Sequence, residues 1–119
     1  MARIEKINAQ VKREISSMLL LGDIKDPRLK FVTITEADVT KDLRQARVKF
    51  SVLDTSAKNI ERVQEGLDSA RGIVRRLIGE RVRMRYTPEI NFIYDRTLEF
   101  SDKIDRTLAE IKKDQTNKS

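Results

Sequence analysis

The stretch Ala46-Arg47-Val48-Lys49-Phe50-Ser51-Val52 decides the fold class of this chain. Its apolar and polar residues alternate, which is the period of a β-strand with one face buried and the other in water. A shorter β-branched stretch, Phe31-Val32-Thr33-Ile34-Thr35, precedes it and predicts a strand over about residues 30–39. Thr40-Lys41-Asp42-Leu43 lies between the two and is polar enough to turn. An antiparallel hairpin is therefore expected.

Helical spacing comes before the hairpin. From Arg3 to about Leu21, apolar residues recur every three or four positions, with charged residues between them. Gly22 is a natural helix terminator, and Pro27 makes continuation of the helix unfavourable. One amphipathic helix is expected to precede the first strand.

Helical spacing returns after the hairpin and is interrupted once. One helix is expected over about residues 57–67, and a second carries the apolar residues of 73–78. Ala70-Arg71-Gly72 lies between them. Because glycine inside a helix costs about 1 kcal/mol relative to alanine, this group indicates a kink or a break.

A third strand, Ile90-Asn91-Phe92-Ile93-Tyr94, follows Pro88, and a last helix is expected to open at Ser101-Asp102. The element order is α-β-β-α-(kink)-α-β-α. The predicted fold class is α+β, a three-stranded sheet with helices on one face. One domain is expected over residues 1–112, followed by a short polar tail over residues 113–119.

Positive charge is concentrated in one segment. The 119 residues include 25 Lys and Arg against 19 Asp and Glu, a net charge of +6. Residues 71–86 carry six arginines and one acid, Glu80, so +5 lies there and +1 in the other 103 residues. Such clustering is typical of a polyanion-binding surface, and arginine favours phosphate forks. A solvated helix face is the alternative interpretation. The six candidate RNA-binding residues are Arg71, Arg75, Arg76, Arg81, Arg83 and Arg85.

Several function classes are excluded by composition. The chain has no cysteine and no histidine, so disulfides, thiolate catalysis and the usual general base are absent. No apolar run approaches the ~20 residues of a membrane helix. We expect a cytoplasmic binding protein that is not an enzyme, holds no metal or cofactor, and does not contact a membrane.

The element order and three local motifs point to one family. The order is that of a type II KH domain, a fold that commonly binds single-stranded nucleic acid. The four glycines, at positions 22, 66, 72 and 79, form no GxxG loop. Lys25-Asp26-Pro27-Arg28-Leu29, the Ala70-Arg71-Gly72 kink and the stretch 86–95 (Tyr-Thr-Pro-Glu-Ile-Asn-Phe-Ile-Tyr-Asp) resemble the bacterial ribosome-binding factor A family over residues 1 to about 112.

This resemblance implies a cytoplasmic assembly factor that binds the free small (30S) subunit. Such a factor assists late maturation of 16S rRNA, including processing of its 5′ end, without being the nuclease, and is linked to growth in the cold. We expect a monomer that an assembly GTPase or a late 30S component displaces. Two alternatives remain open: a general nucleic-acid-binding module, and a stress factor or adaptor that contacts a ribosomal protein.

Within the predicted site, the kink has two interpretations. Arg71 projects from the bend toward a phosphate, or Gly72 simply permits close helix packing. Arg81, Arg83 and Arg85 alternate, so an extended backbone would point all three the same way, with Val82 and Met84 inward. Five further cations are candidate extensions of this surface, although a solvated face is the favoured interpretation for each: Arg47, Lys49, Arg3, Lys6 and Arg13.

The aromatic residues predict how RNA is recognised. The four phenylalanines, Phe31, Phe50, Phe92 and Phe100, occupy apolar positions and are expected to pack in the core or at its edge. Tyr86 and Tyr94 are the only other aromatic residues. Because a stacking platform needs several exposed rings, recognition is expected to depend on phosphates and RNA shape.

Overall fold

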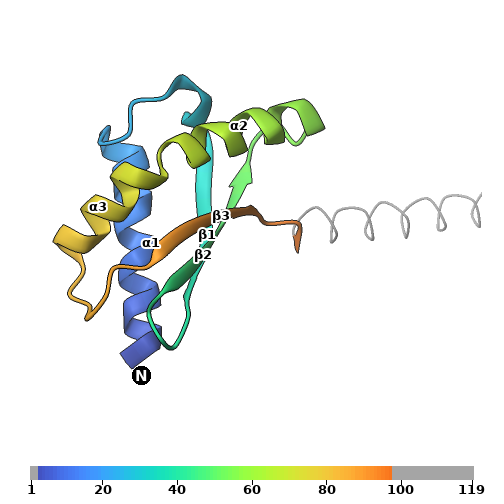
Figure 1. Ribbon diagram of the computed structural model, residues 1–119. Coiled ribbons are helices and arrows are strands. Elements are labelled where there is room, and N and C mark those ends of the chain that lie inside the picture. Colours follow the sequence, from blue (N-terminus) through green and yellow to red (C-terminus); the bar gives the residue numbers. More distant parts are fainter. Residues whose placement is uncertain (1–2, 98–119) are drawn as a thin grey trace, which may run out of the picture.

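A computed structural model describes residues 3–97 of the chain and shows an α+β domain (Figure 1). Its elements are α1 (Arg3–Leu21), the short 3-10 helix η1 (Pro27–Leu29), β1 (Val32–Val39), β2 (Gln45–Val52), α2 (Ala57–Ser69), α3 (Arg71–Arg81) and β3 (Glu89–Tyr94). The predicted order is confirmed up to the third strand. The helix expected from Ser101 and the tail over 113–119 lie outside the described residues.

The sheet has the strand order β1-β2-β3. β1 pairs with β2 in antiparallel fashion, which confirms the hairpin, and β3 lies parallel to β2. Ala46 is a central register position, with Val39 beside it on one side and Ile90 on the other. A parallel neighbour requires a crossover, which α2 and α3 supply.

The hydrophobic core lies between one face of the sheet and the helices. Alternate residues of β2, including Val48 and Phe50, are fully buried, and α1 contributes Val11, Ile15 and Met18 to the same cluster. Figure 1 shows the helices on one side of the strands. The fold class predicted from the alternation in β2 is therefore confirmed.

The boundary between α2 and α3 is a single residue, Ala70. Its backbone N–H contacts the carbonyls of Gly66 and Leu67, and its own carbonyl accepts from Val74 N at 3.0 Å. Ala70 is buried, whereas Gly72 is exposed and a Cβ added there would meet nothing within 4 Å. The interpretation that Gly72 permits close helix packing is wrong, because no element among residues 3–97 packs against it.

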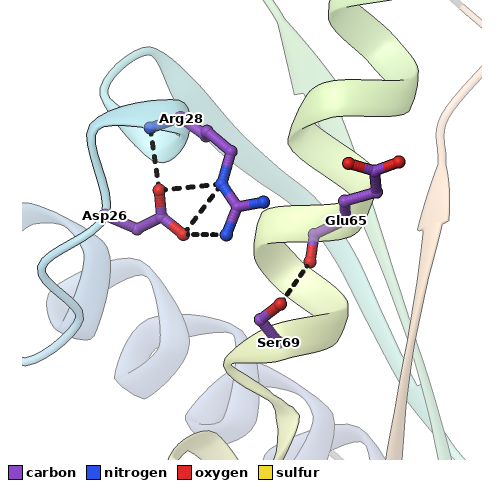
Figure 2. A network of polar contacts seen from close by, with 4 residues as sticks. All are labelled: Asp26, Arg28, Glu65 and Ser69. Carbon is purple, nitrogen blue, oxygen red and sulfur yellow. Dashed lines mark hydrogen bonds and ion pairs between the residues drawn. The ribbon is translucent and has the colours of Figure 1, made fainter.

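The family motif around Asp26 has a structural role (Figure 2), and we call the hydrogen-bonded pair of Asp26 and Arg28 the Asp26 brace. Asp26 Oδ1 accepts the backbone N–H of Arg28 at 3.0 Å and starts η1, while Arg28 Nη2 contacts Asp26 Oδ2 at 2.7 Å. These hydrogen bonds from Arg28 hold the pKa of Asp26 below its usual value. A Cβ on Gly66 of α2 would lie 3.0 Å from Leu29 Cδ2, so the brace packs directly on the α2 backbone.

Asp95, the last residue of another family motif, also has a structural role. The sheet contains a bulge between Ile34 and Glu36 of β1. At this bulge, the Thr35 hydroxyl donates to Asp95 Oδ2 at 2.6 Å, which lowers the pKa of Asp95. The chain segment after β3 is thereby joined to the β1 edge strand.

Candidate nucleic-acid interface

A cleft of about 490 Å³ opens where three chain segments meet at one end of the fold. The segments are the first turns of α1, the β1–β2 turn and the connection from α3 to β3, which Figure 1 shows at the end that carries the N-terminus. Its lining has four cations and one acid. We call this the basic cleft; its residues are Arg3, Ile4, Ile7, Lys41, Asp42, Leu43, Arg44, Arg85 and Tyr86.

The β1–β2 turn is pinned by hydrogen bonds to one carboxylate. The Thr40 hydroxyl donates to Asp42 Oδ1 at 2.7 Å, and Arg44 N donates to the same oxygen at 3.1 Å. The Thr40 hydrogen bond lowers the pKa of Asp42. Leu43 adopts a left-handed φ of 62°, which is uncommon for this residue type, and packs against the core. The turn therefore holds Lys41 and Arg44 at a fixed place on the rim.

The connection from α3 to β3 is held against the rest of the fold. Glu89 N donates to the Arg44 carbonyl at 2.9 Å, which joins the start of β3 to the β1–β2 turn. Arg75 Nη2 donates to the Thr87 carbonyl at 3.2 Å, and a Cβ on Gly79 would lie only 2.9 Å from Thr87 Oγ1. The residues between, including Arg85, are thus positioned beside the turn.

An aromatic ring lies among the cations of the cleft. Tyr86 is 47% exposed, with the guanidinium carbons of Arg44 and Arg85 at 5.6 and 5.4 Å from its ring centroid. Phe31 is also exposed, at 64%. The expectation that Phe31 packs in the core or at its edge is wrong, because Phe31 precedes β1 and its ring is exposed beside the ammonium group of Lys30.

The other phenylalanines fall into two groups. Phe50 and Phe92 are buried as predicted, and Phe100 lies outside the described residues. Tyr86 is the one ring that lines the cleft, so the cleft offers a single aromatic side chain and not a platform of several rings.

The candidate arginines of α3 and its C-terminal connection differ in their partners. Arg71 and Arg83 are exposed and make no ion pair with any acid within residues 3–97. Arg75 Nε lies 3.7 Å from Glu89 Oε1, and Arg76 Nη1 lies 3.7 Å from Glu80 Oε1. Exposed pairs of this kind contribute little to stability, so both arginines are available to a phosphate at small cost.

Arg81 has a different role from the one its spacing predicts. It is the last residue of α3, and the backbone becomes extended at Val82, so Arg81, Arg83 and Arg85 are exposed in alternation, as predicted. Arg81 Nη1 contacts Asp23 Oδ2 at 3.1 Å and Glu14 Oε2 at 3.8 Å, and the Asp23 hydrogen bond raises the pKa of Arg81. Arg81 thereby joins α3 to α1.

The inward positions beside Arg81 agree with the sequence. Val82 is buried and Met84 is half-buried against the core, as predicted.

The five possible extensions of the basic surface fall into three groups. Arg3 lines the basic cleft, whereas Lys6 and Arg13 lie exposed on α1. Arg47 and Lys49 lie on the open face of the sheet, at 3.9 Å from Asp38 and 3.3 Å from Glu36. These exposed cross-strand pairs contribute little to stability, like those of Arg75 and Arg76, and neither Arg47 nor Lys49 lines the cleft.

Two cations and the one aromatic residue of the cleft are missing from the site predicted from sequence: Lys41, Arg44 and Tyr86. The signal for the first two was present, since a turn with two cations leads into a strand. Their approach to Arg3 and Arg85 depends on the parallel pairing of β3, which local spacing does not encode.

Metal and membrane sites are not found in the described part of the chain. Within residues 3–97, no group of three or more acidic side chains is placed to hold a metal ion. Over the same residues, no helix combines the length and the apolar character needed to cross a bilayer.

Comparison with known proteins shows which family the chain resembles. The family model described as ribosome-binding factor A matches residues 3–108. A ribosome-binding factor A from Acetivibrio thermocellus is 47% identical over 111 residues, 92% of this chain and 89% of that relative. The crystal structure of ribosome-binding factor A from Thermus thermophilus has the same fold, with a TM-score of 0.68 at 24% identity over 78% of this chain and 97% of that one.

A further match is a homology model of the Thermus thermophilus factor, fitted into a cryo-EM map of its complex with the 30S subunit. It has a TM-score of 0.61 and 25% identity, and the match covers 81% of this chain and 96% of that one. The match of the family model over most of the sequence agrees with the motifs around Asp26, Ala70 and Asp95. The chain belongs to the ribosome-binding factor A family.

Proposed function

We propose that this protein binds the free 30S subunit in the cytoplasm and assists late maturation of 16S rRNA. The observation that carries the proposal is the basic cleft, where four cations from three segments face one acid that the Thr40 hydroxyl and the Arg44 backbone already engage. Fixed cations of this kind bind RNA phosphates by releasing counterions. The Thermus relative fitted into a 30S complex supports the choice of subunit.

The exposed arginines of α3 extend the proposed contact. Arg71 lies at the start of α3, beside the exposed backbone of Gly72, and Arg75 and Arg76 follow within the next two turns. A phosphate at this helix start also meets the positive end of the helix dipole. We assign the RNA contact to these three arginines, Arg83 and the basic cleft, and leave Arg81 to the α1–α3 contact.

The proposed mechanism is selection among rRNA conformations. A binding protein shifts an equilibrium only by its difference in affinity for the two states. Tight binding to one rRNA arrangement favours that arrangement, and processing of the 16S 5′ end by a separate nuclease follows. Binding alone supplies no energy for departure, so release requires a competing partner, for which we propose an assembly GTPase.

Sedimentation of the protein with 30S, 50S and 70S particles, with naked rRNA as competitor, tests the proposal. We expect selective sedimentation with free 30S. If the four cations of the cleft and Arg71, Arg75, Arg76 and Arg83 each neutralise one phosphate, log K against log salt falls with a slope of about −5.6 to −7.2. Equal sedimentation with every RNA would identify a general nucleic-acid binder. A slope near zero would identify a protein adaptor, and either result would overturn the proposal.

A further inference from the structure

The basic cleft has a feature that a track for RNA phosphates does not need, which is an apolar floor. Ile4 and Leu43 are half-buried and Ile7 is 6% exposed, and all three line the cleft beneath the charged rim. Phosphates are hydrated anions and gain nothing from an apolar surface. The floor therefore indicates a ligand with an uncharged part that enters the cleft.

The size of the cleft agrees with such a ligand. Its volume of about 490 Å³ lies within the range of sites that enclose small molecules, about 300–1,000 Å³. Paired RNA does not place a base in such a hollow, because the deep major groove is closed to side chains and the minor groove is shallow. Only a nucleotide turned out of its helix fits.

The aromatic side chain supplies a stacking partner. The half-exposed ring of Tyr86 has the guanidinium carbons of Arg44 and Arg85 at 5.6 and 5.4 Å from its centroid. Tyrosine rings and guanidinium planes are the surfaces on which unpaired RNA bases stack. We infer that the basic cleft binds a single unpaired nucleotide of rRNA, with its base against Tyr86 and the apolar floor and its phosphates on Arg3, Lys41 and Arg44.

An acidic peptide segment is the competing class of ligand. Its carboxylates would satisfy the rim cations, but they do not stack on the Tyr86 ring as a nucleobase does. The combination of one ring with two guanidinium groups favours the nucleotide. This inference rests on the proposed function, because it names what the same site holds within rRNA.

The test uses RNA hairpins that differ at one position. All three share one structured tetraloop. The stem of the first carries a single-nucleotide bulge, the stem of the second carries an abasic residue in that bulge, and the stem of the third is fully paired. Tyr86 and Tyr94 are the only tyrosines of the chain, so in a Tyr94→Phe variant the tyrosine fluorescence reports on Tyr86 alone. We expect at least fivefold tighter binding of the bulged RNA than of the other two, with quenching of Tyr86 only by the bulged RNA.

Substitutions of Tyr86 distinguish the contribution of base stacking to RNA affinity from the contribution of charge. Tyr86→Leu and Tyr86→Ala should remove the preference for the bulge while affinity for the paired hairpin stays within about twofold, whereas Tyr86→Phe should keep the preference. Lys58→Gln, an exposed cation of α2 outside the cleft, is the control for general charge. The melting temperature of each variant establishes that it folds, and the two truncations give independent measurements.

Different outcomes overturn different conclusions. Equal affinity for all three hairpins, in a protein that still sediments with 30S, would overturn the nucleotide site and leave the proposed function intact. Quenching of Tyr86 by hexaglutamate without any bulge preference would assign the cleft to an acidic segment instead. A clear bulge preference without 30S binding would overturn the proposed function and support the nucleotide site.

Discussion

The basic cleft and the groove between α2 and β3 differ in charge more than in shape. The groove is the larger of the two, at about 730 Å³ against 490 Å³. It is lined by Glu61 and Glu65 with one cation, Arg96, whereas the cleft has four cations and one acid. Gln64 Nε2 also donates to the Phe92 carbonyl at 2.9 Å, which ties α2 to the β3 side of the groove. Size alone would select the groove, but a polyanion selects the cleft.

The largest effect is expected from reversing the charge of the basic cleft. Arg44→Glu with Arg85→Glu replaces two attractions with two repulsions, so we expect about 100-fold weaker binding to 30S, measured by sedimentation. The matched control, Lys25→Glu with Lys58→Glu, changes the same charge at exposed positions outside both sites and should alter affinity by less than about threefold. Equal losses in both double variants would show that net charge, not the cleft, drives binding.

A complementary test gives the groove between α2 and β3 the positive charge of the basic cleft. Glu61→Lys with Glu65→Lys removes two repulsions, and we expect about tenfold tighter binding to any single-stranded RNA at low salt. The log K against log salt plot should become steeper by about 1.4, which corresponds to two added single-strand contacts. Unchanged affinity and slope would mean that the acids of α2 do not exclude RNA from the groove.

Two glycines of the helices between these regions should respond in opposite ways to alanine. Gly72→Ala meets open space and gains helix propensity, so the free energy of unfolding should rise by about 0.5–1 kcal/mol. Gly66→Ala places its Cβ against Leu29 and the Asp26–Arg28 pair, and overpacking of this kind costs about 1–3 kcal/mol. Urea unfolding of both variants measures the difference, and the same sign for both would contradict the packing described here.

The smallest expected effect is the acid sensitivity of the Asp26 brace. The pKa of Asp26 in the folded protein lies below the ordinary value of 3.8. The contribution of this carboxylate to the free energy of unfolding is therefore complete above that value and is lost as the pH falls through the lower folded pKa. Asp26→Asn should therefore lose less stability than the wild type between pH 6 and pH 3 in urea unfolding. Asp42, Asp54 and Asp95 shift in the same direction and leave a residual dependence in the variant.

The basic cleft offers a matched contrast to this acid sensitivity. The chain has no histidine, the side chain whose ordinary pKa lies near this range, so no side chain of the cleft is expected to change charge between pH 6 and pH 8. Affinity for 30S should be flat over that range, and a bell-shaped or sloping profile would point to titration outside the cleft.

The fold was predictable because its signals are local. Alternation in β2, the cap oxygen of Ser56, and the apolar spacing of α1 each depend on residues close in sequence. The helix break was also visible, but its cause was assigned to the wrong residue. Ala70 separates the two helices. Gly72 has the lower helix propensity, but it lies within α3 and faces open space.

The site was predictable only in part because it depends on tertiary contacts. Counting arginines along residues 71–86 includes Arg81, which two acids from α1 and the following loop engage. The same count omits Arg44, which the parallel pairing of β3 brings beside Arg85. Charge density along a sequence does not distinguish cations that hold the fold together from those that face a ligand.

The hydrogen bond from Glu89 N to the Arg44 carbonyl has a consequence for synthesis of the chain. It forms only after β3 pairs with β2, across 45 residues of sequence separation. Such long-range pairings carry a large loop-closure cost and arise late in folding. A nascent chain that has not yet emerged past residue 89 already contains Arg3, Lys41 and Arg44, but it cannot assemble them with Tyr86. A ribosome therefore completes the basic cleft only after translating most of the domain.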